Sequence, residues 1–464
     1  MWFKSSFPIP AVVAISFCLI GGTTPAYADL GDQLFKLLAD DGAAFDRFGV
    51  SVAISGSTAI VGAMQDDDNG IQSGSAYLFD TTTGRQIAKL LPNDGAAWDR
   101  FGVSVAISGA TTIIGAFRDD DNGIQSGSAY LFDTTTGVQI VKLLPDDGAL
   151  DDHFGFSVAI SGDTAIVGAA FDDDNGSNSG SAYLFDINTG QQIAKLLPDD
   201  GTAEDRFGRS VAIDETIGKG VAIVGAYLDN DNGFQSGSAY LFNITTGQQI
   251  AKLLPNDSAF GDLFGWSVAI RGSVAIVGAR FGNDKDNGID SGSAYLFDTT
   301  TGRQLFKLLP NDGAAIDQFG WSVSISAVSG KEIAIVGALG DDDNGANSGS
   351  AYLFNTTTGK QIAKLLPDDG TAGDEFGESV AIGGDTAIVG AWKDYSGSAY
   401  LFDAAAPGTC PWDLQGDGIV GPGDLLILLG WWGFDPGGPP DFDGDGNVGA
   451  SDLLALLANW GPCP

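Results

Sequence analysis

Hydrophobic and polar positions repeat along most of the chain. The string Phe-Gly-x-Ser-Val-(Ala/Ser)-Ile recurs at spacings of 53, 53, 53, 57, 55 and 57 residues. Its copies begin at Phe48, Phe101, Phe154, Phe207, Phe264, Phe319 and Phe376. Each unit holds four short β-rich apolar runs, at 51–54, 59–63, 75–79 and 86–91 in the first unit, with turn-forming residues between them. No run has the length or period of a helix, so the pattern predicts an all-β, seven-bladed β-propeller with four strands per blade.

The two ends of the array predict how the ring closes. The seventh unit ends with the run 398–402 and lacks a fourth strand. A matching run, Gln33-Leu34-Phe35-Lys36-Leu37-Leu38, stands before the first unit. Because unpaired sheet edges are prone to association, a ring gains from pairing them. We therefore expect the N-terminal strand to pair with the strand around Tyr400 and to complete the last blade.

The repeated motifs resemble a known family. Phe-Gly at the start of each unit, Val-Gly-Ala after the second strand and Gly-Ser-Ala-Tyr-Leu-Phe in the third resemble bacterial FG-GAP repeats, which are similar to the propeller repeats of integrin α subunits. The resemblance covers about residues 33–403. Integrin-type repeats carry a calcium loop between the first two strands. Here that loop is Ser55-Gly56-Ser57 or a near equivalent, which offers too few oxygen ligands, so integrin-style calcium binding is not expected there.

Antiparallel strand order predicts two unlike faces. The loops after the second and fourth strands share one face and are rich in Asp, whereas the turns on the other face are nearly neutral. Asp oxygens at alternating positions are candidate Ca²⁺ ligands. The alternative is that these are solvated loops that keep the protein soluble. The candidate positions are Asp66, Asp68, Asp119, Asp121, Asp172, Asp174, Asp229, Asp231, Asp284, Asp286, Asp341 and Asp343.

Charge narrows the classes of partner. The chain has 60 acidic and 22 basic side chains, a formal net charge of -38, and 55 Asp against five Glu. A surface this negative repels nucleic acid and anionic lipid and suits cations or basic partners. We therefore expect no nucleic acid partner. No segment after the N-terminus is apolar for long enough to span a membrane.

The sequence offers no distinct catalytic constellation. The single histidine, His153, stands where other repeats carry various residues, which is typical of an exposed loop position. Trp266 and Trp321 occupy the variable position of the Phe-Gly-x-Ser-Val motif, where we expect them to pack between blades. The blades are nearly copies, and we expect no enzymatic activity, although a pair of carboxylates for glycoside hydrolysis stays open.

A different composition begins after residue 405, and two segments repeat there at an offset of 28 residues. Each has oxygen-bearing residues at loop positions 1, 3 and 5, a glycine at 6, a backbone carbonyl at 7 and Asp at 12, followed by apolar residues at helical spacing. This predicts two Ca²⁺ loops, each leading into a helix. The candidate ligands are Asp413, Gln415, Asp417, Ile419 and Asp424 in the first loop, and Asp441, Asp443, Asp445, Asn447 and Asp452 in the second.

Paired loops of this kind in about 55 residues resemble a type I dockerin, a calcium-folded module that docks onto cohesin domains. The resemblance implies a small α-helical calcium-loop module and a cohesin-like or cell-surface partner. Cys410 and Cys463 flank the module, and a disulfide between them is expected in an oxidising compartment. A calcium-stabilised tail without a partner is the alternative reading.

The N-terminus completes the expected organisation. Lys4, an apolar stretch and small residues ending Ala26-Tyr27-Ala28 are typical of a secretory signal peptide. We expect a signal peptide at 1–28, a propeller at 29–405, a linker at 406–409 and the calcium module at 410–464. The expected function is a secreted or cell-surface binding protein that presents its acidic face to an extracellular protein or glycan. The alternatives are a carbohydrate-binding or glycan-degrading component of a polysaccharide-processing complex, and a purely structural envelope protein.

Overall fold

The computed structural model describes residues 30–216, 220–283, 287–328, 331–405, 412, 414, 419–433, 440, 442 and 447–462. Several predictions lie outside these residues. They are the signal peptide, the linker, the Cys410–Cys463 disulfide, and the candidate ligands Asp284, Asp286, Asp413, Gln415, Asp417, Asp441, Asp443 and Asp445.

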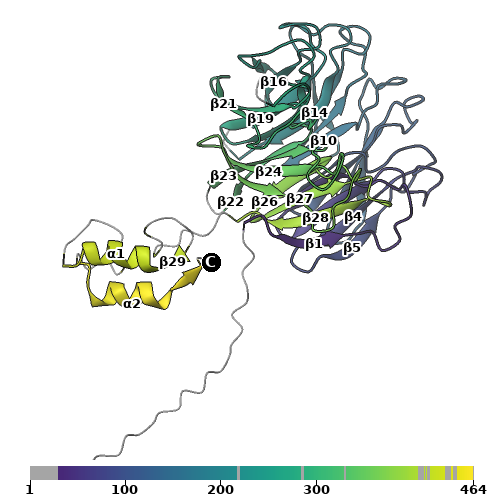
Figure 1. Cartoon of the computed structure of the whole chain (residues 1–464). Helices are drawn as coiled ribbons and strands as arrows, with labels where there is room; N and C mark the ends of the chain where they lie inside the picture. Colours follow the sequence, from purple (N-terminus) through teal and green to yellow (C-terminus); the bar gives the residue numbers. More distant parts are fainter. Residues whose placement is uncertain are drawn as a thin grey trace, which may run out of the picture.

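Strands β1 to β28 form seven four-stranded antiparallel sheets arranged as the blades of a propeller (Figure 1). The first blade contains β2 (Phe48–Ser55), β3 (Thr58–Ala63), β4 (Ser75–Asp80) and β5 (Arg85–Leu90) in sequence order. The next five blades are β6 (Val105–Ser108), β7 (Thr111–Ala116), β8 (Ser128–Asp133), β9 (Gln139–Leu143); β10 (Ser157–Ser161), β11 (Thr164–Ala169), β12 (Ser181–Asp186), β13 (Gln192–Leu196); β14 (Phe207–Asp214), β15 (Val221–Ala226), β16 (Ser238–Asn243), β17 (Gln249–Leu253); β18 (Phe264–Arg271), β19 (Val274–Ala279), β20 (Ser293–Asp298), β21 (Gln304–Leu308); and β22 (Val323–Val328), β23 (Lys331–Ala338), β24 (Ser350–Asn355), β25 (Lys360–Leu365). The predicted seven-bladed propeller is confirmed.

The last blade closes the ring as predicted. It contains β26 (Ser379–Gly383), β27 (Thr386–Ala391) and β28 (Ser398–Asp403), with β1 (Gln33–Leu37) as its fourth strand. β1 pairs antiparallel with β28, so that Lys36 lies opposite Tyr400 and Leu37 opposite Ala399. Both ends of the propeller chain are thereby held in one sheet, and β28 has no free edge.

The hydrophobic core lies between neighbouring blades. The middle strands are buried on both faces because each sheet is covered by the sheets before and after it; in β3 and β4 almost every residue is buried. Ile60, Leu78 and Leu90 of the first blade pack against Phe101 and Tyr130 of the second. Equivalent clusters join the other neighbouring blades, including the last and the first.

The Phe-Gly pair has a physical reason in every repeat. Phe101 is fully buried and meets the ring of Tyr130 edge-on at 5.6 Å. Gly102 has a φ of +87°, and a Cβ there would lie 2.3 Å from the carbonyl oxygen of Ser75 in the preceding blade. Only glycine fits so close a contact between backbones. The motif therefore fixes how each blade packs on the one before it.

The C-terminal module contains two short helices and a two-stranded ribbon. α1 (Pro422–Gly430) and α2 (Ala450–Ala458) follow the two repeated segments, and β29 (Ile419–Val420) pairs with β30 (Gly461–Pro462). Val420, Leu428, Val448 and Leu456 form its small core. Among the described residues, no helix has the length and apolar character needed to cross a membrane.

Candidate functional site

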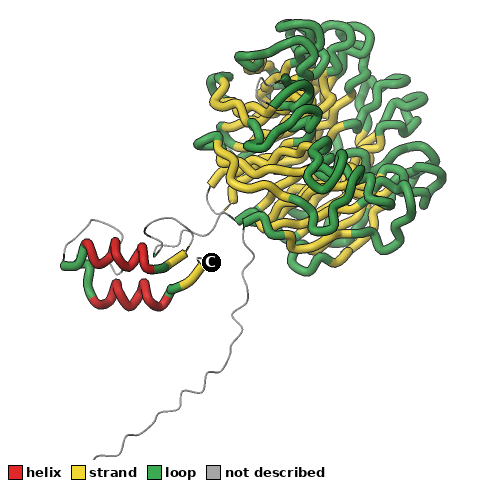
Figure 2. The backbone as a smooth tube through the Cα atoms, in the orientation of Figure 1, coloured by secondary structure: helices red, strands yellow, loops and turns green. Residues whose placement is uncertain are grey.

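The loops after the second and fourth strands lie on one face of the propeller, which we call the loop face. These longer loops are green in Figure 2 and gather on one side of the strands. Backbone hydrogen bonds join them in pairs between blades; the N–H of Trp98, for example, donates to the carbonyl of Ile71 at 2.8 Å. The loop face is thus a continuous surface made of paired loop tips.

The aspartates of the loop face surround lysine side chains. The Nζ atom of Lys89 lies 2.7, 3.1 and 2.6 Å from carboxylate oxygens of Asp41, Asp66 and Asp68. The hydroxyl of the buried Tyr77 lies 2.8 Å from Asp66. Burial opposes the charge of Lys89, but its hydrogen bonds to the three carboxylates outweigh burial and raise its pKa. We call this arrangement the lysine network.

The lysine network recurs around the outer part of the loop face, with Lys on the outermost strand of each blade. It consists of Lys142 with Asp94, Asp119 and Asp121; Lys195 with Asp147, Asp172 and Asp174; Lys252 with Asp200, Asp229 and Asp231; and Lys364 with Asp312, Asp341 and Asp343. A two-carboxylate form joins Lys36 to Asp369 and Asp394, and Lys307 pairs with Asp257. In these described blades, the candidate Ca²⁺ ligands of the loops contact a lysine ammonium group. Calcium binding in these loops stays a prediction.

A pocket of about 380 Å³ lies at the centre of the ring, where the first strands of all seven blades meet. The variable position of each Phe-Gly-x-Ser-Val motif lines it on the side of the loop face, followed by the serine and the valine. Trp266 and Trp321 therefore line the central pocket, and they also pack between blades as expected, since their rings contact each other across two consecutive blades. The variable positions are Val50, Val103, Phe156, Arg209, Trp266, Trp321 and Glu378.

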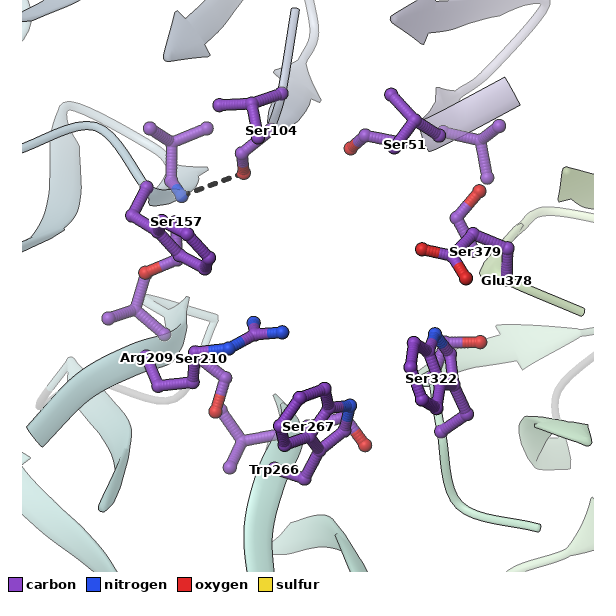
Figure 3. Close-up of a pocket in the computed structure, with 18 of the residues that line it drawn as sticks. Ser51, Ser104, Ser157, Arg209, Ser210, Trp266, Ser267, Ser322, Glu378 and Ser379 are labelled. Carbon is purple, nitrogen blue, oxygen red and sulfur yellow. Dashed lines mark hydrogen bonds between the residues drawn. The ribbon is translucent and has the colours of Figure 1, made fainter. Parts of the chain in front are cut away.

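The motif serines join neighbouring blades around the pocket. The Oγ of Ser157 donates to the carbonyl of Gly208 at 2.8 Å, and the Oγ of Ser379 donates to the carbonyl of Gly49 at 2.8 Å across the closure. The Oγ of Ser104 instead accepts the N–H of Val158 at 3.0 Å, the bond drawn in Figure 3. These hydroxyls are engaged in holding the ring together.

Arginine and aromatic side chains gather around the central pocket. The guanidinium of Arg209 lies 4.2 Å from the ring centre of Trp266, and that of Arg280 lies 3.6 Å from the same ring. Trp266 and Trp321 are tilted against each other with ring centres 5.2 Å apart. Outside the central pocket, Arg47 lies 4.3 Å from the ring centre of Trp392 in the same way. Such contacts stabilise a cation on an aromatic face.

One carboxylate faces this cationic region. Glu378 lines the pocket, and its Oε2 is buried without a hydrogen-bond partner. Burial, and then repulsion from Glu375, raise the pKa of Glu378 to about 7 despite the nearby charges of Arg209, Lys393 and Arg47. Figure 3 shows the Arg209 guanidinium and the Glu378 carboxylate pointing into the pocket from opposite sides.

His153 is not an exposed loop residue, so that expectation is wrong. Its ring packs between Phe117 and Phe171, at 5.2 and 4.4 Å between ring centres. Its Nε2 lies 3.2 Å from the amide oxygen of Gln125. Burial, and then the charges of Arg118 and Arg206, lower the pKa of His153 to about 4. The neutral ring thus belongs to the same aromatic and arginine region around the axis.

Large apolar side chains are exposed at the paired loop tips. Phe45 and Tyr395 are 80% and 79% exposed, and the rings of Phe234 and Phe260 stack at 5.8 Å. In five of the seven pairs of joined loops, both loops expose an apolar side chain: Tyr395 and Phe45, Ile71 and Trp98, Ile124 and Leu150, Phe234 and Phe260, and Ile289 and Ile316. Leu150 and Phe260 directly precede Asp151 and Gly261, whose N–H groups make the backbone bond in their loops. The loops joined by Ser177–Glu204 and by Ala346–Gly373 expose no large apolar side chain. Exposed apolar groups gathered on one face typically mark a binding surface.

A second hollow, of about 410 Å³, lies between the last and first blades. Phe45, Arg47, Trp392 and Tyr395 are among the residues that line it. The last blade has only residues 392–397 between its second and third strands, a shorter loop than its counterparts. The short loop leaves aromatic side chains open at this position.

The C-terminal module places two of its predicted ligands at helix starts. The Oδ2 of Asp424 accepts the N–H of Gly421 at 2.7 Å, and the Oδ2 of Asp452 accepts the N–H of Gly449 at 2.7 Å. The Oδ1 of Asp452 accepts the N–H of Phe442 at 2.7 Å, so the end of the second loop lies against its start. Ile419 lies in β29, and Asn447 lies just before α2. Within the described ranges no three acidic, histidine or cysteine side chains converge as a metal site; the other loop positions lie outside those ranges.

Sequence reasoning missed two groups of residues. The Tyr and Lys of the lysine network occur at the same positions of every repeat, in Ala-Tyr-Leu-Phe and Lys-Leu-(Leu), and this regularity was the available signal. The residues of the central pocket occur at the one motif position that varies most between repeats. Because all of them occupy the same position of their repeats, a closed ring brings them together at its axis, and this was the available signal.

Comparison with protein families agrees with this architecture. A family model described as FG-GAP repeat matches residues 32–79, 85–132, 138–185, 191–242, 248–297, 303–354 and 360–402. The chain belongs to the FG-GAP repeat family. Each match begins at the outermost strand of one blade and ends in the third strand of the next. No curated protein matches the chain. The FG-GAP propeller fold suggests a protein-binding role, and such repeats are typical of extracellular proteins.

Proposed function

We propose that this FG-GAP repeat protein is an exported, non-catalytic binding protein whose loop face binds an extracellular protein. Its C-terminal module would bind Ca²⁺ and attach the protein to a cohesin-like domain or to the cell surface. The single observation that carries the proposal is the set of five exposed apolar loop-tip pairs on one face. Full burial of one such side chain contributes about 1.5–3 kcal/mol, so a few of them are enough to anchor a partner.

Backbone geometry at the loop tips supports a binding role. The loop residue directly before Asp46, or before the equivalent Asp of the other repeats, has a positive φ in each repeat. In two repeats this residue is glycine, Gly261 and Gly373. Phe45, Trp98 and Ile316 adopt the same conformation with φ of 75°, 79° and 75°. Bulky residues in this region cost of order 1–3 kcal/mol each. The placement of large apolar side chains at these exposed positions supports contact with a partner.

The charge of the loop face limits the partner. Between the apolar tips lie exposed aspartates, among them Asp67, Asp120, Asp173 and Asp342. The lysine networks neutralise only part of this charge. We therefore expect a partner surface with basic side chains around apolar ones.

The test is a pull-down from a cell-surface extract of the source with the full chain as bait. Replacing Phe45, Trp98, Phe260 and Ile316 together by Ser should weaken capture of the partner at least tenfold. The matched control replaces Ile87, Ile140, Ile193 and Leu305, which are also exposed but lie on outermost strands. Equal loss in both variants, or no loss in the loop variant, would contradict the proposal. The same pull-down with and without Ca²⁺ separates capture by the module from capture by the propeller.

Carbohydrate binding is the second candidate function. The observation that favours it is the aromatic hollow lined by Phe45, Trp392 and Tyr395, because sugar rings stack on exposed aromatic faces. Retention on immobilised polysaccharides, lost in Trp392→Ala and kept in Trp98→Ala, would support it. Release of reducing sugars from the same polysaccharides would indicate a glycan-degrading activity instead.

A further inference from the structure

The loop face separates its two kinds of basic residue. Lysines occupy the outer part, where each contacts aspartates. Six of the nine arginines lie against aromatic rings, and Arg209 among them lines the central pocket: Arg47, Arg100, Arg118, Arg206, Arg209 and Arg280. Across the described residues, the one ion pair that any arginine makes joins Arg206 to Glu204. In a chain with 60 acidic side chains, the other five of these arginines form no ion pair with a described carboxylate.

Two of these arginines place their positive charges against the same tryptophan ring. Arg209 and Arg280 lie at 4.2 and 3.6 Å from the ring centre of Trp266. Burial, and then the charge of Arg209, lower the pKa of Arg280 to about 10. The buried Nε of Arg280 has no hydrogen-bond partner, and no ion pair of either guanidinium is found within the described chain. Two partly buried cations that form no ion pair are an incomplete arrangement.

The geometry of the pocket leaves room for that anion. Arg209 points into the central pocket of about 380 Å³ from one wall, and Glu378 points into it from the other (Figure 3). No ion pair between these two described residues closes the gap. A volume of this size is at the lower end of that of pockets for small ligands, and it also fits one or two side chains of a partner.

A cation is the less suitable occupant. The aromatic faces that would hold one, Trp266 and Trp321, already carry Arg280 at 3.6 and 4.6 Å. The neighbouring Glu375 is engaged with the Nε1 of Trp392 at 2.9 Å and with Lys393. Positive charge is therefore in excess around Arg209, and an acceptor of hydrogen bonds from a guanidinium is the complementary group.

The outer aspartates decide what kind of anion can approach. A chain with many negative groups, such as a nucleic acid or a sulfated polysaccharide, is repelled by the aspartates of the loop face before it reaches the axis. A single carboxylate that projects from a basic protein surface is favoured twice. The basic surface is attracted by the aspartates of the loop face, and the carboxylate is attracted by Arg209 in the central pocket. The loop face is thus a cationic centre within an anionic surround.

We propose that the central pocket receives one carboxylate side chain, Asp or Glu, that protrudes from the protein partner and binds the guanidinium of Arg209. Arg280 strengthens the positive potential behind Trp266. This inference rests on the proposed function, because it assigns a specific contact of the same loop face.

The test uses the full chain and a blocked glutamate, N-acetylglutamate N-methylamide, as the probe. Saturation-transfer NMR should detect its binding, and the blocked glutamine, which differs only in charge, should bind at least tenfold more weakly. Arg209→Gln should weaken binding of the blocked glutamate at least tenfold, and Arg280→Gln should weaken it severalfold. Arg303→Gln, an exposed arginine next to the outermost strand of its blade, should leave it unchanged.

The Glu378→Gln variant distinguishes a carboxylate ligand from a ligand that carries both a carboxylate and an ammonium group. A carboxylate ligand should bind this variant as well as or better than it binds the unaltered chain, because a negative charge is removed. Loss of binding would overturn the proposal in favour of an occupant with an ammonium group. Equal binding of blocked glutamine, or no effect of Arg209→Gln, would also overturn it. Tighter binding of glucuronate than of blocked glutamate would assign the pocket to an acidic sugar and not to a protein.

Failure here is distinguishable from failure of the proposed function. If Arg209→Gln abolishes probe binding but captures the partner undiminished, the pocket is not where the partner inserts, and the loop-face function stands. If the loop-tip variant captures the partner undiminished, the proposed function fails while the pocket chemistry is unaffected. Loss of partner capture in both variants, with an unchanged Tm, supports both.

Discussion

The outer part and the centre of the loop face use charge in opposite ways. Outside, Lys89 and its equivalents are surrounded by aspartates, and in the first blade the hydroxyl of Tyr77 also bonds to Asp66. At the centre, Arg209 and Glu378 face a pocket without partners among the described residues. The outer residues are the same in almost every repeat, whereas the central position holds Val twice, Trp twice, and Phe, Arg and Glu once each. Repetition therefore marks what folds the blades, and its interruption marks what is available to a ligand.

The comparison predicts its largest effect at the lysine network. Lys89→Met leaves the carboxylates of Asp41, Asp66 and Asp68 without their cation, and Asp66 is buried. Breaking such a buried pair should lower the free energy of unfolding by about 3 kcal/mol. Urea unfolding measures this. Lys360→Met is the matched control, since that exposed lysine begins the outermost strand of its blade on the other face and should change stability by less than about 0.5 kcal/mol.

The penalty should depend on pH in a defined direction. Hydrogen bonds from Lys89 and Tyr77 outweigh burial and lower the pKa of Asp41 below its ordinary 3.8. A lowered folded-state pKa contributes stability above the unfolded value, and that contribution is lost as the pH falls through the folded value. The difference between Lys89→Met and the unaltered chain should therefore shrink below about pH 4. A penalty that is constant from pH 7 to pH 3 would show that Lys89 acts by packing alone.

The centre should show the opposite behaviour. The pKa of Glu378 is raised to about 7, with Glu375, Arg209, Lys393 and Arg47 as the charged groups that act on it. A carboxyl group with a raised pKa makes folding less favourable as the pH rises from its unfolded value to its folded one. Glu378→Gln should therefore stabilise the protein by about 1–3 kcal/mol at pH 8 and have little effect at pH 5.

Thermal unfolding at the two pH values tests this, with Glu204→Gln as the control because Glu204 is exposed on the loop face. A stabilising substitution at the centre would indicate that Glu378 is retained for binding at some cost to stability. A destabilising effect at pH 8 would mean that the carboxylate has a structural partner, and the contrast between centre and surround would be lost.

The same contrast between repeated and variable positions explains which features of the structure the sequence predicts. Strand number, blade order and closure by Gln33–Leu37 could be predicted because each repeat has its own copy of the same pattern and the last lacks its fourth strand. The central pocket could not, because Phe156, Arg209, Trp266, Trp321 and Glu378 are more than 50 residues apart from one to the next. Only the curvature of a closed ring brings these positions together.

The contacts of individual side chains could not be predicted from the sequence either. The candidate Ca²⁺ ligands of the loops were inferred from the spacing of aspartates, but the lysine that contacts them comes from a strand 23 residues further along, as for Asp66 and Lys89. For His153, the variation at equivalent positions of the other repeats predicts an exposed loop residue, whereas the ring is packed between Phe117 and Phe171. In both cases the local pattern gave the residue type, and packing across blades decided what it touches.

The smallest expected effect concerns calcium and the propeller. In the lysine networks, an ammonium group already lies within 3.1 Å of the oxygens that Ca²⁺ would use, as in Lys89 with Asp66. Displacing it would cost those ion pairs, so Ca²⁺ should shift the unfolding temperature of the propeller by less than about 2 °C.

The C-terminal module should respond differently in the same experiment. Its core is small, and ions held near Asp424 and Asp452 would supply much of its stability. Chelation should therefore abolish the far-ultraviolet circular dichroism of α1 and α2 and leave the propeller transition in place. Asp452→Asn should weaken the response, because its carboxylate holds the start of α2 and the N–H of Phe442. A large calcium-dependent shift of the propeller transition in this variant would contradict this expectation. It would show that Ca²⁺ replaces the lysine ammonium groups among the aspartates of the loop face. The outer part of the loop face would then bind a ligand as well as stabilise the blades.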